Sequence, residues 1–272
     1  VGQIGFKFLD EERIGGQMNY EPSEEMNYDN GYGIKIRTRR YELFTKTGYI
    51  FNNANESSLG FVNGFSWHDQ NSEFGFNKYT GKEINLNSNL IFQSNMNSEH
   101  NKYSTGASFI YDDYDENLND SSFARREIVP GTFFEYTYSN AHNLTILAGI
   151  RADFHNLYGT FFTPRVHIKY NITENLILRA SAGKGYRTAN IIAENSSILA
   201  SSRKLIMLND PKQEEAWNYG INLSKFFDIL GREVAINLDF YRTDFVNQIV
   251  VDRDQDVFNV YVYNLDGRSY SN

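Results

Sequence analysis

The stretch Asn143–His155, NLTILAGIRADFH, alternates between two kinds of side chain along its whole length. Apolar residues occupy the even-numbered positions from Leu144 to Phe154, whereas the odd-numbered positions include Arg151 and Asp153. Successive side chains of a β-strand point to opposite faces, so this pattern predicts a strand with one apolar and one polar face.

The same alternation recurs along much of the chain, and many of the predicted strands reach about 10 residues, where strands of globular proteins average about 5–6. It is found at Ile84–Gln93, Arg165–Tyr170, Leu176–Gly183, Ala216–Leu223 and Val234–Tyr241. The polar faces are dense in Arg, Lys, His, Asp and Asn. A soluble β-sandwich also produces alternation, so the pattern by itself leaves the two classes of protein open.

The predicted connections differ systematically in length, and this favours a barrel. Short links are expected at Asn52–Ser57, Asn97–Asn101, Ser139–Asn143, Asn171–Asn175, Asp228–Arg232 and Leu265–Ser269. Links of varied and often greater length are expected at Asp10–Tyr32, Gly75–Gly81, Asp112–Arg125, Leu157–Phe161, Tyr186–Lys212 and Asp252–Asp256. Short turns at one strand end and longer loops at the other are typical of outer-membrane barrels.

This count gives an all-β, antiparallel transmembrane barrel segment of about twelve strands, with a thirteenth beginning near Tyr270. The alternation fails near Arg39–Tyr41, where we expect a β-bulge. Aromatic residues gather near predicted strand ends, as in the interfacial girdles of barrels. The alternative is that these aromatic side chains fill the core of a sandwich.

The composition agrees with long strands. Aromatic residues make up 15 % of the 272 residues and there are only 4 prolines, which suits uninterrupted ladders. The absence of cysteine excludes disulfides, thiolate metal sites and a cysteine nucleophile. The net charge of −8 argues against a nucleic-acid partner. No apolar run approaches the length of about 18 residues that a membrane-spanning helix needs.

No grouping of residues predicts catalysis or a cofactor. The sequence lacks a Ser–His–Asp arrangement, a phosphate loop and a dinucleotide fingerprint, and its five histidines have no zinc-site spacing. We therefore expect no catalytic residues, no enzyme activity and no cofactor.

One acidic segment, DDYDENLND, offers hard oxygen ligands that could hold Ca²⁺. The weak candidate ligands are Asp112, Asp113, Asp115 and Asp120. Their spacing is not that of an EF-hand, and a solvated run of charge is the alternative.

Several segments carry distinctive strand-and-loop motifs. Leu178–Ile191, LRASAGKGYRTANI, is similar to a strand that ends in a Gly–aromatic–Arg unit and opens a long outer loop. The other matching segments are FTPR (Phe162–Arg165), PKQEEAWNYG (Pro211–Gly220), NLDFYRTD (Asn237–Asp244), NQIVV (Asn247–Val251) and VYNLD (Val262–Asp266). These segments resemble landmarks of TonB-dependent receptors of the Gram-negative outer membrane. Their order fits a receptor barrel over Phe161–Asn272, and the style of the sequence resembles receptors of Bacteroidetes.

The resemblance implies a 22-stranded barrel around an N-terminal plug, energised through TonB. On this interpretation residues 1–272 form a partial barrel domain, and the plug, the TonB-binding segment and the carboxy-terminal strands are absent from the chain. The implied partners are outer-membrane lipid, the plug, TonB through the missing N-terminal region, a small solute and a surface lipoprotein.

The predicted loop Tyr186–Lys212 holds the candidate contacts with a ligand or with the plug, because loops on a rigid scaffold commonly carry specificity. These candidates are Tyr186, Arg187, Asn190 and Arg203. The alternative for Arg187 is a structural charge that is satisfied inside a polar lumen. The alternative for the other residues is a solvated loop that is partly helical at Asn190–Ala200.

The leading functional hypothesis is TonB-energised uptake of a scarce solute such as a siderophore, cobalamin, a glycan or a peptide. A passive outer-membrane porin and a soluble adhesive β-sandwich are the two alternatives.

Overall fold

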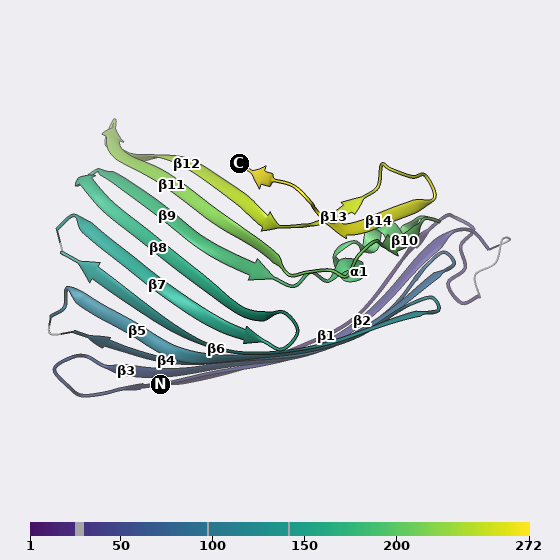
Figure 1. The fold of residues 1–272 in the computed structure, drawn as a ribbon, viewed down its shortest axis with the longest axis horizontal. Helices are drawn as coiled ribbons and strands as arrows, with labels where there is room; N and C mark the ends of the chain where they lie inside the picture. The colour runs from purple at the N-terminus through teal and green to yellow at the C-terminus, as the bar shows by residue number, and fades with distance from the viewer. Residues whose placement is uncertain (25–29, 97, 141) are drawn as a thin grey trace.

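A single curved antiparallel sheet of twelve strands dominates the protein (Figure 1). The computed structural model describes residues 1–24, 30–96, 98–140 and 142–272. The strands of this sheet are β1 (Gly2–Gly16), β2 (Gly33–Ile50), β3 (Ser58–Phe74), β4 (Asn77–Asn95), β5 (Asn101–Leu118), β6 (Ser121–Ser139), β7 (Leu144–His155), β8 (Gly159–Thr173), β9 (Leu176–Arg187), β11 (Glu214–Ile229), β12 (Arg232–Asn247) and β15 (Ser269–Ser271).

Each strand of this sheet pairs with the next strand of the sheet in sequence order. Smaller elements outside the sheet lie in the chain between β9 and β11 and between β12 and β15. The pairing shifts register only at Asn171/Thr173 and at Glu215/Ala216. The sheet is open, since β1 pairs with β2 alone and β12 pairs with only three residues of β15. The prediction of about twelve antiparallel strands is confirmed.

The remaining elements gather at one end of the sheet, on its concave side (Figure 1). Helix α1 (Ile191–Glu194), the 3-10 helix η1 (Ser196–Ala200) and β10 (Lys204–Met207) follow β9, and the hairpin of β13 (Ile249–Asp252) and β14 (Asn259–Asn264) follows β12. A three-stranded sheet in the order β10–β14–β13 joins the two segments. We call residues 188–213 and 248–268 together the outer cap, and the sheet end that carries it the outer end.

Within the described ranges, no helix is long and apolar enough to cross a membrane. The helical turns predicted within Asn190–Ala200 are confirmed as α1 and η1. The sandwich alternative requires two comparable sheets packed over their length. The second sheet found in the described residues has only three short strands, so the architecture does not support that alternative.

Several predicted connections are wrong in length or place, because the strands extend further at the outer end than their alternation suggests. The expected loops Gly75–Gly81 and Asp112–Arg125 are tight turns, since β3 to β6 run on to them. Asp252–Asp256 and Leu265–Ser269 are not links between wall strands, because both lie in the connection between β12 and β15. Accordingly, the segment at Tyr270 is the twelfth wall strand and not the thirteenth. Three predicted links include positions that lie outside the described residues, namely 25–29, Asn97 and Ala141.

Away from the outer end, the two faces of the sheet differ in polarity as predicted. The convex face exposes large apolar side chains: Leu43, Phe65, Leu90, Ile150, Leu238 and Phe240. The concave face is polar and internally bonded. For example, Arg179 donates to Asn222 over 2.9 Å, and Asn222 donates to Asp239 over 2.7 Å. Apolar groups facing outward and polar groups facing inward are the signature of a membrane barrel wall.

At the outer end of β2 to β6 this polarity is inverted. The concave face carries Ile34, Ile36, Phe74 and Tyr79, which pack together. The convex face carries ion pairs, among them Arg126 with Asp113 at 2.9 Å.

This inversion explains why the alternation fails near Arg39–Tyr41. The expected bulge is absent there, since β2 pairs residue by residue with β1 and β3 through that point. The apolar side chains change from one face to the other at this level while the backbone ladder continues.

Two rows of aromatic rings border the apolar band of the convex face. Phe8, Tyr41 and Trp67 form the row nearer the outer end, with ring centroids 4.9 and 5.5 Å apart. Tyr49, Phe51, Phe92, Tyr103 and Phe134 form the other row. Along β2, Tyr41 and Tyr49 are separated by about 27 Å of strand, which is about 20 Å of height for a strand tilted by about 40°.

The position of Leu90 between these rows leads to a first prediction, because Leu90 lies on β4 between Ile84, the partner of Trp67, and Phe92. Leu90 is 42 % exposed on the convex face, so Leu90→Arg should destabilise the protein folded in a bilayer by about 2–4 kcal/mol. The control is Lys169→Gln on the concave face, which should lower the stability of the folded protein much less. A folding titration in lipid vesicles measures both variants. Equal losses would contradict the assignment of the faces.

Candidate functional site

The outer cap rests on the inverted, apolar part of the concave face. Ile192 of α1 and Leu199 of η1 are buried against Phe74 and Tyr79, and Leu205 of β10 joins the same cluster. Burying apolar area in this way is worth about 25 cal/mol per Å². The cap is therefore a packed layer of the structure.

Arg125, on β6, holds the start of the cap. Its guanidinium donates to the carbonyl oxygen of Ala189 over 3.3 Å and to the side-chain oxygen of Asn190. It also lies over the Tyr114 ring, 4.7 Å from the centroid. The planar, multiply donating guanidinium is suited to joining several acceptors.

Glu127, two residues along the same strand, is the centre of a buried polar group. Its carboxylate accepts hydrogen bonds from Thr188 of the cap over 3.1 Å and from His155 of β7 over 3.0 Å. Arg125 completes the group through an ion pair of 2.6 Å. The Nδ1 atom of His155 accepts the Leu157 backbone N–H over 3.1 Å, so Nε2 is the nitrogen that donates to Glu127.

The far end of the cap is fixed to the same place. Gln213 donates to Thr188 over 3.2 Å, and Asn247 donates to the Gln213 carbonyl over 2.6 Å. Glu214 accepts the backbone N–H of Ile249 over 3.0 Å. Both segments of the cap thus begin on one hydrogen-bonded base.

The structure brings Arg187 and Asn190, two of the four predicted contact residues, together at this base. The Arg187 guanidinium donates to Glu214 over 2.6 Å and to Glu194 over 3.1 Å. The Asn190 backbone N–H donates to the same Glu194 carboxylate over 2.9 Å.

Tyr186 and Arg203 lie elsewhere. The Tyr186 ring packs on Phe161, the ladder partner of Asp153, with centroids 4.5 Å apart. Arg203 donates to the carbonyl oxygen of Arg253 over 2.7 Å and so links the two segments of the cap.

The acidic candidates for Ca²⁺ do not converge. Asp112, Asp113 and Asp115 belong to strand β5, so Asp112 lies on the face opposite to the other two, and Asp120 lies in the following turn. Asp113 is paired with Arg126. In the part of the chain that the structure describes, no group of three or more His, Asp or Glu side chains could hold a metal ion.

A cavity of about 530 Å³ lies between the cap and strands β5 and β6. Its wall combines Tyr114, Arg125, Tyr158, Ile192 and Lys212. Sequence reasoning missed Arg125, Glu127 and His155, which look like ordinary lumenal residues of alternating strands. Their importance depends on Thr188 and Asn190, more than 60 positions away from Arg125 and Glu127.

Residues 5–272 match the protein-family model described as TonB dependent receptor-like, beta-barrel. The chain belongs to the TonB-dependent receptor family. No curated protein sequence matches this receptor chain.

Solved receptor structures share the fold of this chain at low sequence identity. The siderophore receptor PirA from Pseudomonas aeruginosa has a TM-score of 0.52 at 12 % identity, over 97 % of this chain and 58 % of PirA. The outer membrane transporter YddB from Escherichia coli has a TM-score of 0.66 at 11 % identity, over 99 % of this chain and 41 % of YddB. P. aeruginosa FpvA bound to heterologous pyoverdines has a TM-score of 0.64 at 11 % identity, over 98 % of this chain and 43 % of FpvA. The receptor chain therefore spans about half of the length of these proteins.

The base of the outer cap generates a second prediction. Glu127→Ala removes the acceptor of Thr188 and His155, and each buried group left without a partner costs about 1–3 kcal/mol. We expect the cap to open more often, so that limited proteolysis cuts residues 188–213 at least about tenfold faster.

Glu135→Ala is the matched control, because Glu135 lies on the same strand and pairs with Arg165 on the wall. It should leave the cleavage rate of the cap unchanged. If the two variants were cut at the same rate, Glu127 would not hold the cap.

Proposed function

We propose that this chain forms part of the wall and the outer cap of an outer-membrane receptor. The receptor takes up a scarce solute with energy delivered through TonB. The proposed location is the outer membrane of a Gram-negative bacterium. The family match over residues 5–272 is the observation that carries the proposal. The proposal includes no catalytic residue and no cofactor.

The two faces of the sheet support a wall in a bilayer. An apolar convex band between two aromatic rows suits contact with lipid, and the polar concave face suits an aqueous or plug-filled interior. Unpaired backbone groups in a hydrocarbon layer cost several kcal/mol each. The open edges at β1 and β12 therefore call for further strands, which we assign to parts of the protein outside residues 1–272.

A plug is the partner we propose for the polar concave face. Lys169, Arg179 and Asp239 line a hollow of about 570 Å³ on that face, away from the outer cap. Such charges can pair with polar groups of a domain seated inside the barrel. A surface lipoprotein above the cap is a further proposed partner.

The four residues predicted from sequence take specific roles in this proposal. Arg187 and Asn190 lie at the base that fixes the cap, and Arg203 joins its two segments. We propose that these three position the cap over the ligand. Tyr186 faces the concave side beside Asp153 and is the proposed contact with plug or ligand.

Uptake in the producing bacterium tests the proposal. Strains lacking the gene, lacking TonB, or lacking both should be compared for uptake of ferric siderophores, cobalamin, oligosaccharides and peptides. We expect the same solute to be lost in all three strains, with no further loss in the double deletion.

Uptake that needs the gene but not TonB would replace this proposal with a passive porin. A second readout is the state of the purified protein. A barrel should require detergent and show heat-modifiable mobility on gels, whereas a protein that stays monodisperse without detergent would contradict any membrane assignment.

A further inference from the structure

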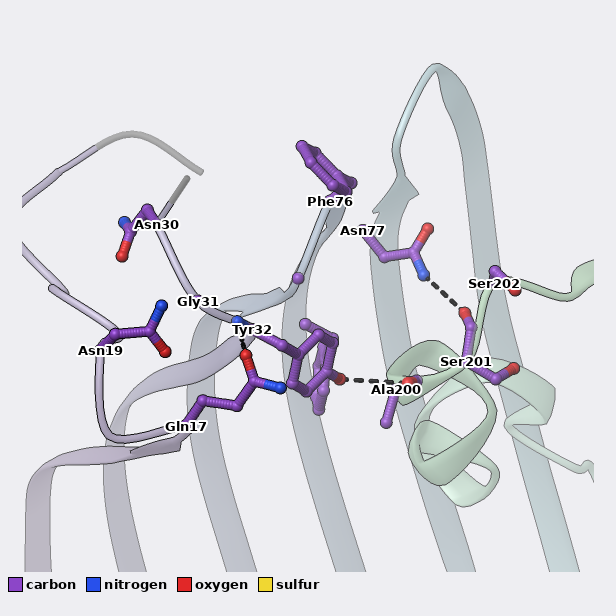
Figure 2. A pocket seen from close by; sticks show the side chains of 12 residues that line it. Gln17, Asn19, Asn30, Gly31, Tyr32, Phe76, Asn77, Ala200, Ser201 and Ser202 are labelled. Atoms are coloured by element: carbon purple, nitrogen blue, oxygen red, sulfur yellow. Dashed lines mark hydrogen bonds between the residues drawn. The ribbon is translucent and has the colours of Figure 1, made fainter. Parts of the chain in front are cut away.

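A second cavity, the outer pocket, opens at the outer end between three segments that are distant in sequence (Figure 2). Its described walls come from the two ends of the connection between β1 and β2, from the turn between β3 and β4, and from the end of η1 with the residues after it. Its volume is about 630 Å³, which lies within the range of about 300–1,000 Å³ typical of small-molecule sites.

Among the residues that the structure describes, the wall of the outer pocket carries no Asp, Glu, Lys, Arg or His side chain. Its 12 described residues are amides, hydroxyls, aromatic rings and small residues: Gln17, Asn19, Asn30, Gly31, Tyr32, Phe74, Gly75, Phe76, Asn77, Ala200, Ser201 and Ser202. Asn19 and Ser202 are exposed to solvent at the pocket. Arg203, the next residue along the chain, has its guanidinium bonded to the Arg253 carbonyl.

Hydrogen bonds between the segments hold this pocket in shape. The Tyr32 hydroxyl donates to the Ala200 carbonyl over 3.1 Å (Figure 2). Asn77 donates to the carbonyls of Leu199 over 2.8 Å and Ser201 over 3.0 Å. A pocket that is already formed avoids much of the entropy that ordering would cost on binding.

The described parts of the connection between β1 and β2 are joined to each other by hydrogen bonds. Asn30, which is only 7 % exposed, accepts the Glu21 backbone N–H over 2.8 Å and donates to the Glu21 carbonyl over 3.1 Å. Gln17 accepts the Tyr32 backbone N–H over 2.9 Å (Figure 2). These bonds give the amide wall a fixed position relative to the ring of Tyr32.

One glycine is required by this geometry. Gly75 has φ +58°, and a Cβ there would lie 2.7 Å from the Tyr32 ring. A side chain at this turn would therefore push into the aromatic wall.

The tyrosine of this wall also stays neutral over the physiological pH range. Burial raises the pKa of the Tyr32 hydroxyl above the ordinary value of a tyrosine. The hydroxyl therefore keeps its proton and continues to donate to Ala200.

We propose that the outer pocket binds a neutral saccharide. Sugar hydroxyls both donate and accept hydrogen bonds, as the amide groups of Gln17 and Asn19 and the hydroxyl of Ser202 do. The C–H faces of a sugar ring pack on aromatic faces such as Tyr32 and Phe76. An anionic ligand would gain most from Arg or Lys donors, and the 12 described residues of the wall supply none.

This inference deepens the proposed function, since it makes a neutral glycan the solute that the receptor captures. The same chemistry is present in neutral sugars of the outer leaflet's own lipopolysaccharide. The two sources differ in size and attachment, so a soluble oligosaccharide and an intact lipopolysaccharide are separate probes.

The test measures binding to the whole protein, purified in detergent. The probes are neutral hexasaccharides of glucose, mannose, xylose and fructose, intact lipopolysaccharide, and ferric citrate as an anionic probe. We expect one neutral hexasaccharide to bind and ferric citrate not to bind at the pocket. Asn19→Ala and Phe76→Ala should each weaken that binding by about tenfold or more.

Phe258→Ala is the matched control, because Phe258 is 76 % exposed at the outer end but does not line the pocket. It should leave the affinity unchanged. Binding of intact lipopolysaccharide alone, weakened by the same two substitutions, would support the saccharide site and assign it to the membrane's own glycan.

Three results would overturn the inference: no binding of any saccharide, saccharide binding that both pocket variants retain, or ferric citrate binding that they abolish. TonB-dependent uptake is scored separately. TonB-dependent uptake of another solute, without saccharide binding, would leave the receptor function standing and remove only the outer-pocket assignment.

Discussion

The continuous backbone ladder is the constraint on which the rest of this structure depends. In a hydrocarbon layer no water is available for N–H and C=O groups, so each wall strand has to pair along its length. The sheet meets this requirement from β1 to β12 with register shifts at only two places. A fixed register also fixes the face of every side chain, because the period of a strand is two residues.

The ladder does not require one face to keep one polarity along its whole length. Between the aromatic rows the apolar side chains are on the convex face, and above them, on β2 to β6, they move to the concave face. The inverted part would expose apolar surface to water if nothing covered it. The outer cap covers it with Ile192 and Leu199, and the buried Glu127 group fixes the start of that cap. The same contacts shape the outer pocket through Ala200.

Much of the wall could be predicted from period-two alternation, because a face in contact with one environment leaves a local signal. The strand at Asn143–His155 is an example. The errors lie where the environment depends on distant residues. Arg39–Tyr41 looks like a bulge because the faces exchange polarity there, and Ile249–Asp252 looks like wall although it pairs within the cap. The candidate site was harder to predict than the wall, because Arg125 and Asn19 lie beside segments that are distant in the sequence.

The position of the membrane boundary at the aromatic row of Tyr41 is the central claim, and nitroxide accessibility tests it most directly. The chain has no cysteine, so single labels can be placed at Arg37, Leu43 and Glu42 in the whole protein in lipid vesicles. The account predicts that oxygen dissolved in the lipid reaches the label at Leu43. A water-soluble nickel complex should instead reach the label at Arg37, which lies above the row on the same face, and the label at Glu42, which lies on the opposite face. Equal accessibility at Arg37 and Leu43 would contradict it.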